Sequence, residues 1–179
     1  MQPTHNTLSE TIRTLSVELL NKHLVTVIDL HSQMKHASWN IRGPSFIPIH
    51  GLFHNVAEDV EDYSERIAER VSGLGGVARG TVRAAAECSF LSPYTLNIAT
   101  EHQHILAVAG ALSACGRSVR EANDQAAAFG DNDTADLFTD ISRGIDRQLG
   151  LVESHIAPRS DDEGHSREAM GFVQTAFHK

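Results

Sequence analysis

Four long stretches of apolar residues at helical spacing dominate this chain of 179 residues. In each stretch the apolar residues recur three or four positions apart, which is the period of an α-helix with one buried face. The first begins at the capping sequence Thr7–Glu10 and ends at the break Arg42–Pro44, and the second runs from about Pro48 to glycines 73, 75 and 76. Signals for β-strands are nearly absent, so the sequence predicts an all-α protein.

The other two stretches complete a four-helix bundle. A third helix is expected from Ser92–Pro93 to Phe129–Gly130, and a fourth from the cap at Asp131–Thr134 to a point before Pro158. A short helix at 81–87 falls in the long connection between the second and third helices, where a bundle with one crossover needs it. We therefore expect one bundle domain at 8–157, with tails at 1–7 and 158–179.

The second tail is nearly neutral and holds four apolar residues spaced for one helical face. This spacing predicts a short helix that docks on the body or on a neighbour, a disordered end being the plainer alternative. The apolar residues are Met170, Phe172, Val173 and Phe177.

The charge balance argues against a simple nucleic-acid binder. Lys and Arg number 15 against 23 Asp and Glu, which gives a net charge of −8, whereas phosphate binding needs a cationic face. Residues 1–9 contain no Lys or Arg, so we expect DNA binding to be weak or absent at physiological salt.

Other features favour a cytoplasmic protein. No apolar run approaches the ~20 residues needed to span a bilayer, and Met1–His5 lacks the basic and apolar regions of a secretory signal. Cys88 and Cys115 form no Cys-x-x-Cys pair, which fits a reducing compartment. We expect both cysteines to be small buried residues.

The second predicted helix carries the side chains best suited to hold a metal. His50 and His54 are four positions apart, as are Glu65 and Glu69, so each pair projects from one face of the helix. Histidine nitrogens and carboxylate oxygens together suit iron, zinc and other divalent first-row metals. A solvated acidic face that happens to include two histidines is the plainer alternative.

The two pairs lie too far apart to share a metal within one chain. His54 and Glu65 are 11 residues apart, which is about 16 Å at 1.5 Å per residue. A single site made of both pairs therefore requires an isologous two-fold dimer with antiparallel second helices. An intrachain di-iron site is poorly supported, because the sequence has one Glu-x-x-His match, Glu101–His104. We interpret His102 and His104 as an exposed or partly buried surface pair.

Motifs spread over all four predicted helices occur in a fixed order. They are DLH at 29–31, KHASWNIRG at 35–43, FIPIH at 46–50, IAER at 67–70, LGG at 74–76, DTADLFT at 133–139 and SR at 142–143. Together they resemble the Dps family, the mini-ferritins named as DNA-binding proteins from starved cells, over about residues 8–157. The resemblance implies a ferritin-like four-helix bundle and a homo-dodecameric hollow shell. It also implies sites at two-fold interfaces that oxidise ferrous iron, preferably with hydrogen peroxide, and a cavity that stores ferric mineral.

The resemblance also assigns metal ligands residue by residue. His50 stands where the family has a second-helix histidine, and His54 stands where it has an aspartate, so an oxygen ligand becomes nitrogen. Glu65 and Glu69 stand at the two carboxylates that the partner subunit supplies. Such a nitrogen-rich site should also accept zinc, which is redox-inert and could block oxidation.

Ser38 takes the place of the family's first-helix histidine, which removes a strong ligand. His31 is on the same face, seven residues or about 10 Å earlier, and is a further ligand candidate. By resemblance Trp39 takes up stray oxidising equivalents, a packed core indole being the alternative. Gly150 replaces a tryptophan common in the family's fourth helix, which predicts a cavity there.

Three aspartates at the start of the fourth helix complete the set of candidates. By resemblance Asp131, Asp136 and Asp140 line three-fold pores that concentrate ferrous ions, and we favour this role for Asp136 and Asp140. Helix capping is the plainer role for Asp131. The sequence thus predicts an iron-oxidising and iron-storing shell that protects against oxidative stress. The alternatives are a shell that sequesters zinc or iron with impaired oxidation, and a nucleoid-protecting particle.

Overall fold

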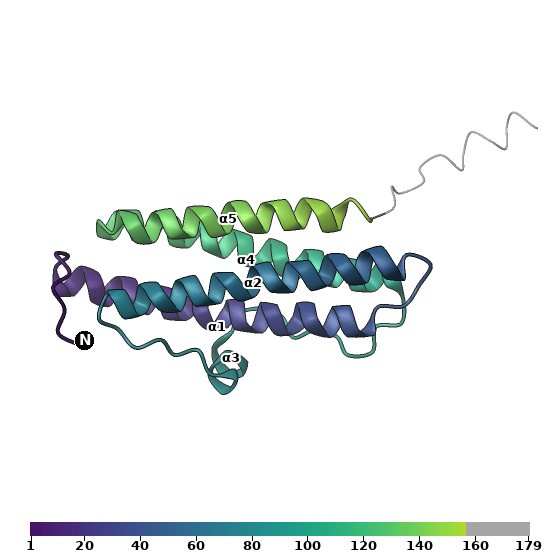
Figure 1. The fold of residues 1–179 in the computed structure, drawn as a ribbon, viewed down its shortest axis with the longest axis horizontal. Helices are drawn as coiled ribbons and strands as arrows, with labels where there is room; N and C mark the ends of the chain where they lie inside the picture. The colour runs from purple at the N-terminus through teal and green to yellow at the C-terminus, as the bar shows by residue number, and fades with distance from the viewer. Residues whose placement is uncertain (157–179) are drawn as a thin grey trace, which may run out of the picture.

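The computed structural model describes residues 1–156. Within them the chain forms five helices and no strand (Figure 1). The helices are α1 (Glu10–Asn40), α2 (Phe46–Gly73), α3 (Val82–Cys88), α4 (Glu101–Phe129) and α5 (Asn132–Glu153).

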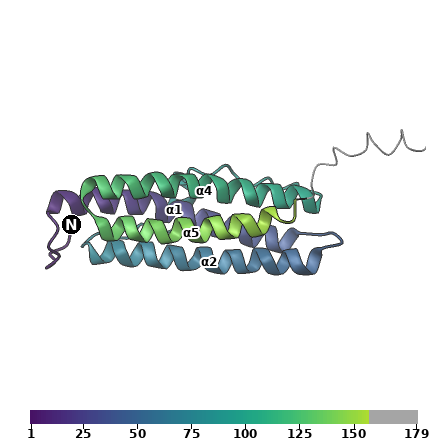
Figure 2. The same cartoon turned by 90° about the horizontal axis from the view of Figure 1, so that it is seen from above.

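The four long helices lie side by side as a bundle (Figures 1 and 2). α1 packs against α2, and α4 packs against α5, with further contacts between α1 and α4 and between α2 and α5. The short helix α3 lies in the connection from α2 to α4 and packs on α1. The all-α, ferritin-like four-helix bundle with a short extra helix in its crossover is therefore confirmed.

Side-chain caps fix where the helices begin. Ser9 Oγ accepts from the Ile12 N–H at 3.3 Å, so the first cap is Ser9 and not Thr7. Thr100 Oγ1 accepts from the Gln103 N–H at 3.2 Å, so α4 begins at Glu101. The predicted start at Ser92–Pro93 is wrong, because residues 91–100 run outside the helix as part of the crossover connection.

The bundle core is a continuous layer of aliphatic and aromatic side chains from all four long helices. It includes Leu20, Leu30, Met34, Phe53, Ile67, Leu112, Phe138 and Ile141, all fully buried. Cys115 is also buried, and burial raises the pKa of its thiol to about 12. Cys88 is exposed at the end of α3, so the expectation of two buried cysteines is wrong for this one.

A histidine also lies inside the bundle. His23 is buried, with Nδ1 2.9 Å from the Leu19 carbonyl oxygen and Nε2 3.1 Å from Ser118 Oγ. Burial lowers the pKa of this imidazole, because the charged form would lose its hydration. His23 is therefore a neutral, hydrogen-bonded part of the core.

The predicted helix in the second tail falls in residues 157–179, outside the described part of the chain. Among residues 1–156, every helix is too short or too polar to cross a membrane.

Candidate metal centre

His50 is held in a defined orientation where α1 meets α2. Its Nδ1 lies 2.8 Å from the Ser38 carbonyl oxygen and 3.2 Å from Ser38 Oγ. The Phe46 ring stacks on the imidazole, with centroids 5.2 Å apart. An Nδ1–H that donates to the carbonyl leaves Nε2 with a free lone pair, which is the arrangement of a metal-binding histidine.

His54 is exposed one turn further along α2 and contacts two charged side chains. Lys35 Nζ lies 3.3 Å from its Nδ1, and Glu58 Oε1 lies 3.3 Å from its Nε2. An ammonium group only donates, so Nδ1 accepts from Lys35 and Nε2–H donates to Glu58. A metal bound to His54 must displace one of these partners.

Lys35 was not among the residues predicted for the site. The signal was available in its spacing, because Lys35 precedes Ser38 by three residues and so lies on nearly the same face of α1. Phe46 was likewise missed, although it stands four residues before His50 on α2.

Glu65 and Glu69 are exposed on the other half of α2. The structure therefore does not bring them to His50 and His54 of the same chain. In residues 1–156 of one chain, no three His, Cys, Asp or Glu side chains lie close enough to hold a metal. A complete site from these four residues needs a second copy of α2.

The remaining candidates from α1 are placed differently. Trp39 is 63% exposed at the end of α1, so the alternative of a packed core indole is wrong. His31 is partly buried on α1, and it is not part of a three-ligand group within the described chain.

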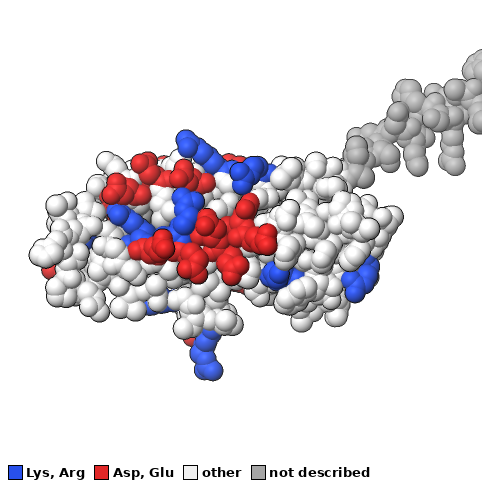
Figure 3. All heavy atoms as spheres, viewed as in Figure 1, with Lys and Arg blue, Asp and Glu red and all other residues white. Residues whose placement is uncertain are grey.

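Acidic side chains gather over α2 and α5 on one face of the bundle (Figure 3). Asp136 and Asp140 are both exposed on α5, where Asp140 pairs with Arg66 of α2 at 3.2 Å. Both carboxylates are thus accessible, as the expected role in attracting cations needs.

Asp131 is enclosed, unlike the other two pore candidates. It is 1% exposed, accepts from the Thr134 N–H at 3.1 Å and pairs with Arg70 at 2.6 Å. Burial alone would raise the pKa of this carboxyl, but the hydrogen bonds from Thr134 and the Arg70 charge outweigh it and lower the pKa. Its position in the chain is that of a helix cap that ties α5 to α2.

Glu101 and His104, which form the Glu-x-x-His match on α4, make hydrogen-bond contacts with Ser45 and Tyr94. Glu101 accepts from the Ser45 N–H at 3.0 Å, and His104 Nδ1 lies 2.7 Å from the Tyr94 hydroxyl oxygen. His104 is buried, so its interpretation as a surface residue is wrong, whereas His102 is exposed as expected.

The chain resembles a known protein domain and a known bacterial protein over most of its length. Residues 17–158 match the Ferritin-like domain. The chain is 34% identical over 157 residues to the "DNA protection during starvation protein" of Agrobacterium fabrum, covering 88% of this chain and 97% of that one.

Two solved structures with a similar arrangement of helices are also Dps proteins. Dps from Mycobacterium smegmatis superposes with a TM-score of 0.83 at 26% identity, covering 89% of this chain and 96% of that one. DpsC from Streptomyces coelicolor gives 0.82 at 26% identity, covering 88% and 91%. Fold, motifs and relatives together establish that the chain belongs to the Dps family of ferritin-like proteins.

Proposed function

We propose that this protein oxidises ferrous iron with hydrogen peroxide at sites shared between two copies of the chain, and stores the ferric product. The observation that carries the proposal is the division of the ligands along α2. His50, with its free Nε2, and His54 lie at one end, while Glu65 and Glu69 are exposed toward the other. Two antiparallel copies of α2 would bring opposite halves together twice.

Each ligand has a defined task in this site. Nε2 of His50 binds the ferrous ion, and the Ser38 carbonyl keeps the ring in place. The carboxylates of Glu65 and Glu69 neutralise the added charge of the ferric product, because oxygen ligands favour the harder ion. Peroxide that takes its electrons here is reduced to hydroxide and does not release hydroxyl radical near DNA.

We further propose the homo-dodecameric shell implied by the family. Exposed Asp136 and Asp140 would line its three-fold pores and draw ferrous ions inward. Relatives carry the name "DNA protection during starvation protein", and here that protection would come from removing iron and peroxide. The net charge of −8 opposes direct binding to the phosphate backbone.

Zinc or iron sequestration with impaired oxidation is the second candidate function. Ser38 supports it, because a hydroxyl stands where the family has a histidine ligand, and its Oγ already lies 3.2 Å from His50 Nδ1. His54 adds a second nitrogen ligand, which suits zinc.

The direct test combines diffraction and kinetics. Crystals of the full chain soaked separately in ferrous iron and zinc are measured at both absorption edges, and ferrous oxidation by peroxide is followed with and without zinc. His50→Ala should abolish the anomalous peak and slow the oxidation. His102→Ala is the matched control, because His102 is exposed and lies on α4.

Iron bound by His50 of one chain and Glu69 of another, with rapid oxidation, would support the proposal. Zinc alone at that position, with no peroxide-dependent oxidation, would favour sequestration. No ion on His50 or His54 would contradict both functions.

A further inference from the structure

The metal centre described above is better suited to one ferrous ion than to two. His50, His54, Glu65 and Glu69 give one first-row ion two imidazoles and two carboxylates, and Ser38 offers no imidazole for a second ion. The Lys35 ammonium lies 3.3 Å from His54 Nδ1 and opposes another cation by charge repulsion. One ferrous ion gives one electron, whereas hydrogen peroxide needs two to become hydroxide.

A tyrosine on the far side of α1 has the geometry of an electron donor. The Tyr94 hydroxyl oxygen lies 2.7 Å from Nδ1 of His104, so the phenol can donate to this nitrogen in the tautomer that carries its proton on Nε2, and the two rings stack at 6.1 Å between centroids. The His36 ring meets Tyr94 edge-on at 5.1 Å. Oxidation of a phenol releases a strongly acidic proton, so a base in direct contact makes the loss of an electron easier.

Burial keeps Tyr94 protonated and His104 neutral before any oxidation. Burial raises the pKa of Tyr94 to about 12, so the phenol remains protonated at rest. Burial, together with the nearby charge of His36, lowers the pKa of His104. The imidazole is therefore neutral at pH 7 and free to accept the proton.

Tyr94 is fixed close to the metal centre. His36, which contacts Tyr94, and Ser38, which contacts His50, are two residues apart on α1 and thus about 200° apart around it, so only the width of this one helix, about 10–12 Å, lies between the two contacts. The connection that carries Tyr94 is tied to α1 by a hydrogen bond from Gln33 Nε2 to the Ser92 carbonyl oxygen at 3.2 Å.

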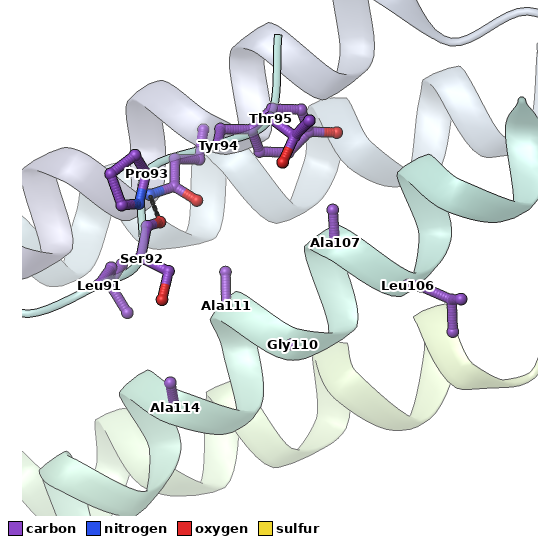
Figure 4. Close-up of a pocket in the computed structure, with 11 residues that line it drawn as sticks. Leu91, Ser92, Pro93, Tyr94, Thr95, Leu106, Ala107, Gly110, Ala111 and Ala114 are labelled. Atoms are coloured by element: carbon purple, nitrogen blue, oxygen red, sulfur yellow. Dashed lines mark hydrogen bonds between the residues drawn. The ribbon is translucent and has the colours of Figure 1, made fainter. Parts of the chain in front are cut away.

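The same connection leaves the phenol accessible to small molecules. Figure 4 shows Tyr94 beside α4, at a cavity of about 320 Å³. A second cavity of about 530 Å³ is lined by Tyr94 and His36.

We propose that Tyr94 supplies the second electron to hydrogen peroxide when one ferrous ion is bound, and that His104 accepts its proton. The inference rests on the proposed function. The ferrous ion and Tyr94 each give one electron, the O–O bond breaks, and two hydroxide ions form. Iron becomes ferric, Tyr94 becomes a neutral radical, and its proton moves to Nδ1 of His104.

The test is freeze-quench EPR on the full-length assembly, loaded with less than one ferrous ion per chain and mixed with one equivalent of peroxide. Wild type should give a tyrosyl radical together with ferric iron. Tyr94→Phe should lose the radical and should increase the hydroxyl adduct of a spin trap. His104→Gln should slow radical formation, because an amide is a much weaker base.

The matched control is the second tyrosine. The chain has two tyrosines, and Tyr63→Phe should keep the radical. The inference is wrong if the signal survives Tyr94→Phe or disappears in Tyr63→Phe. Ferric iron without any tyrosyl radical in wild type would overturn this inference alone, whereas the absence of ferric iron would overturn the proposed function as well.

Discussion

The carbonyl of Ser38, more than its hydroxyl, determines the orientation of the His50 ring. The carbonyl oxygen is 2.8 Å from Nδ1, and Oγ is 3.2 Å from the same atom. A backbone carbonyl survives any side-chain substitution, so the orienting contact of this histidine is independent of the residue type at position 38.

Ser38→Ala should therefore change zinc affinity only slightly. We expect a loss below about tenfold, because the loss of a true orienting partner typically costs about 10–100-fold. His50→Ala, which removes the ligand itself, should lose more than Ser38→Ala. Isothermal titration with zinc measures both, and equal losses for the two variants would contradict the orienting role of the backbone.

His23 should make the fold sensitive to mild acid. Burial lowers its pKa in the folded state, while the unfolded chain titrates near 6.5, so stability declines as the pH falls below about 6.5. His23→Gln should flatten the dependence of Tm on pH between 7 and 5. His102→Gln is the exposed control and should keep the wild-type slope. An unchanged slope in His23→Gln would show that His23 is not the titrating group.

At the scale of helices, α2 and α5 pack closely because Gly144 makes room for Tyr63. A Cβ at position 144 would overlap the Tyr63 hydroxyl oxygen, whereas a Cβ at Gly150 would meet no atom within 4 Å. Gly150 is exposed, so the open space beside it is solvent, and the cavity expected where the family often has tryptophan stays a prediction. Because both glycines lie on α5, Gly150→Ala can serve as the control for Gly144→Ala.

Gly150→Ala should stabilise the protein by about 0.5–1 kcal/mol, because alanine has the better helix propensity. Gly144→Ala should destabilise it by about 1 kcal/mol or more, since overpacking exceeds that gain. Tyr63→Phe in the Gly144→Ala background should recover part of the loss. Chemical denaturation gives all three values, and a stabilising Gly144→Ala would contradict the packing described for this helix pair.

The cap of α5 also joins two helices through charge. The lowered pKa of Asp131 means that its contribution to stability is present above about pH 4 and is lost as the carboxyl is protonated at lower pH. Asp131→Asn keeps a capping side chain but not the ion pair with Arg70, and should lower stability at pH 7 by about 2 kcal/mol. The difference from wild type should shrink toward pH 3.

The stability difference between Asp131→Asn and wild type is measured by thermal unfolding at several pH values between 7 and 3. Asp133→Asn is the control, because Asp133 is 83% exposed and sits 3.6 Å from the same Arg70. A loss that is equal at pH 3 and pH 7 would mean that the ion pair contributes little.

Helix periodicity predicted the bundle well, because each long helix buries one continuous apolar stripe. The start of α4 was missed because apolar residues such as Leu91 pack on the core from a non-helical connection. The family motifs predicted His50, but Lys35 and the Tyr94–His104 pair depend on contacts between helices. Such contacts produce no periodic pattern in the sequence.

At the scale of the whole molecule, the four proposed ligands lie in two pairs along α2 that do not meet within one chain. His54, Glu65 and Glu69 are exposed, and in residues 1–156 no three His, Cys, Asp or Glu side chains lie close enough to hold a metal. The proposed oxidation therefore depends on a metal centre that is shared between two copies of the chain.

Mixed assemblies test this claim most directly. His50→Ala/His54→Ala removes one half of every site, and Glu65→Gln/Glu69→Gln removes the other, so each variant alone should be inactive in peroxide-driven ferrous oxidation. Random co-assembly of equal amounts places both variants in half of the two-fold pairs, and each mixed pair regains one of its two sites. We predict about a quarter of wild-type activity per chain. A mixture that stays as inactive as its components would show that the four residues do not form a shared centre.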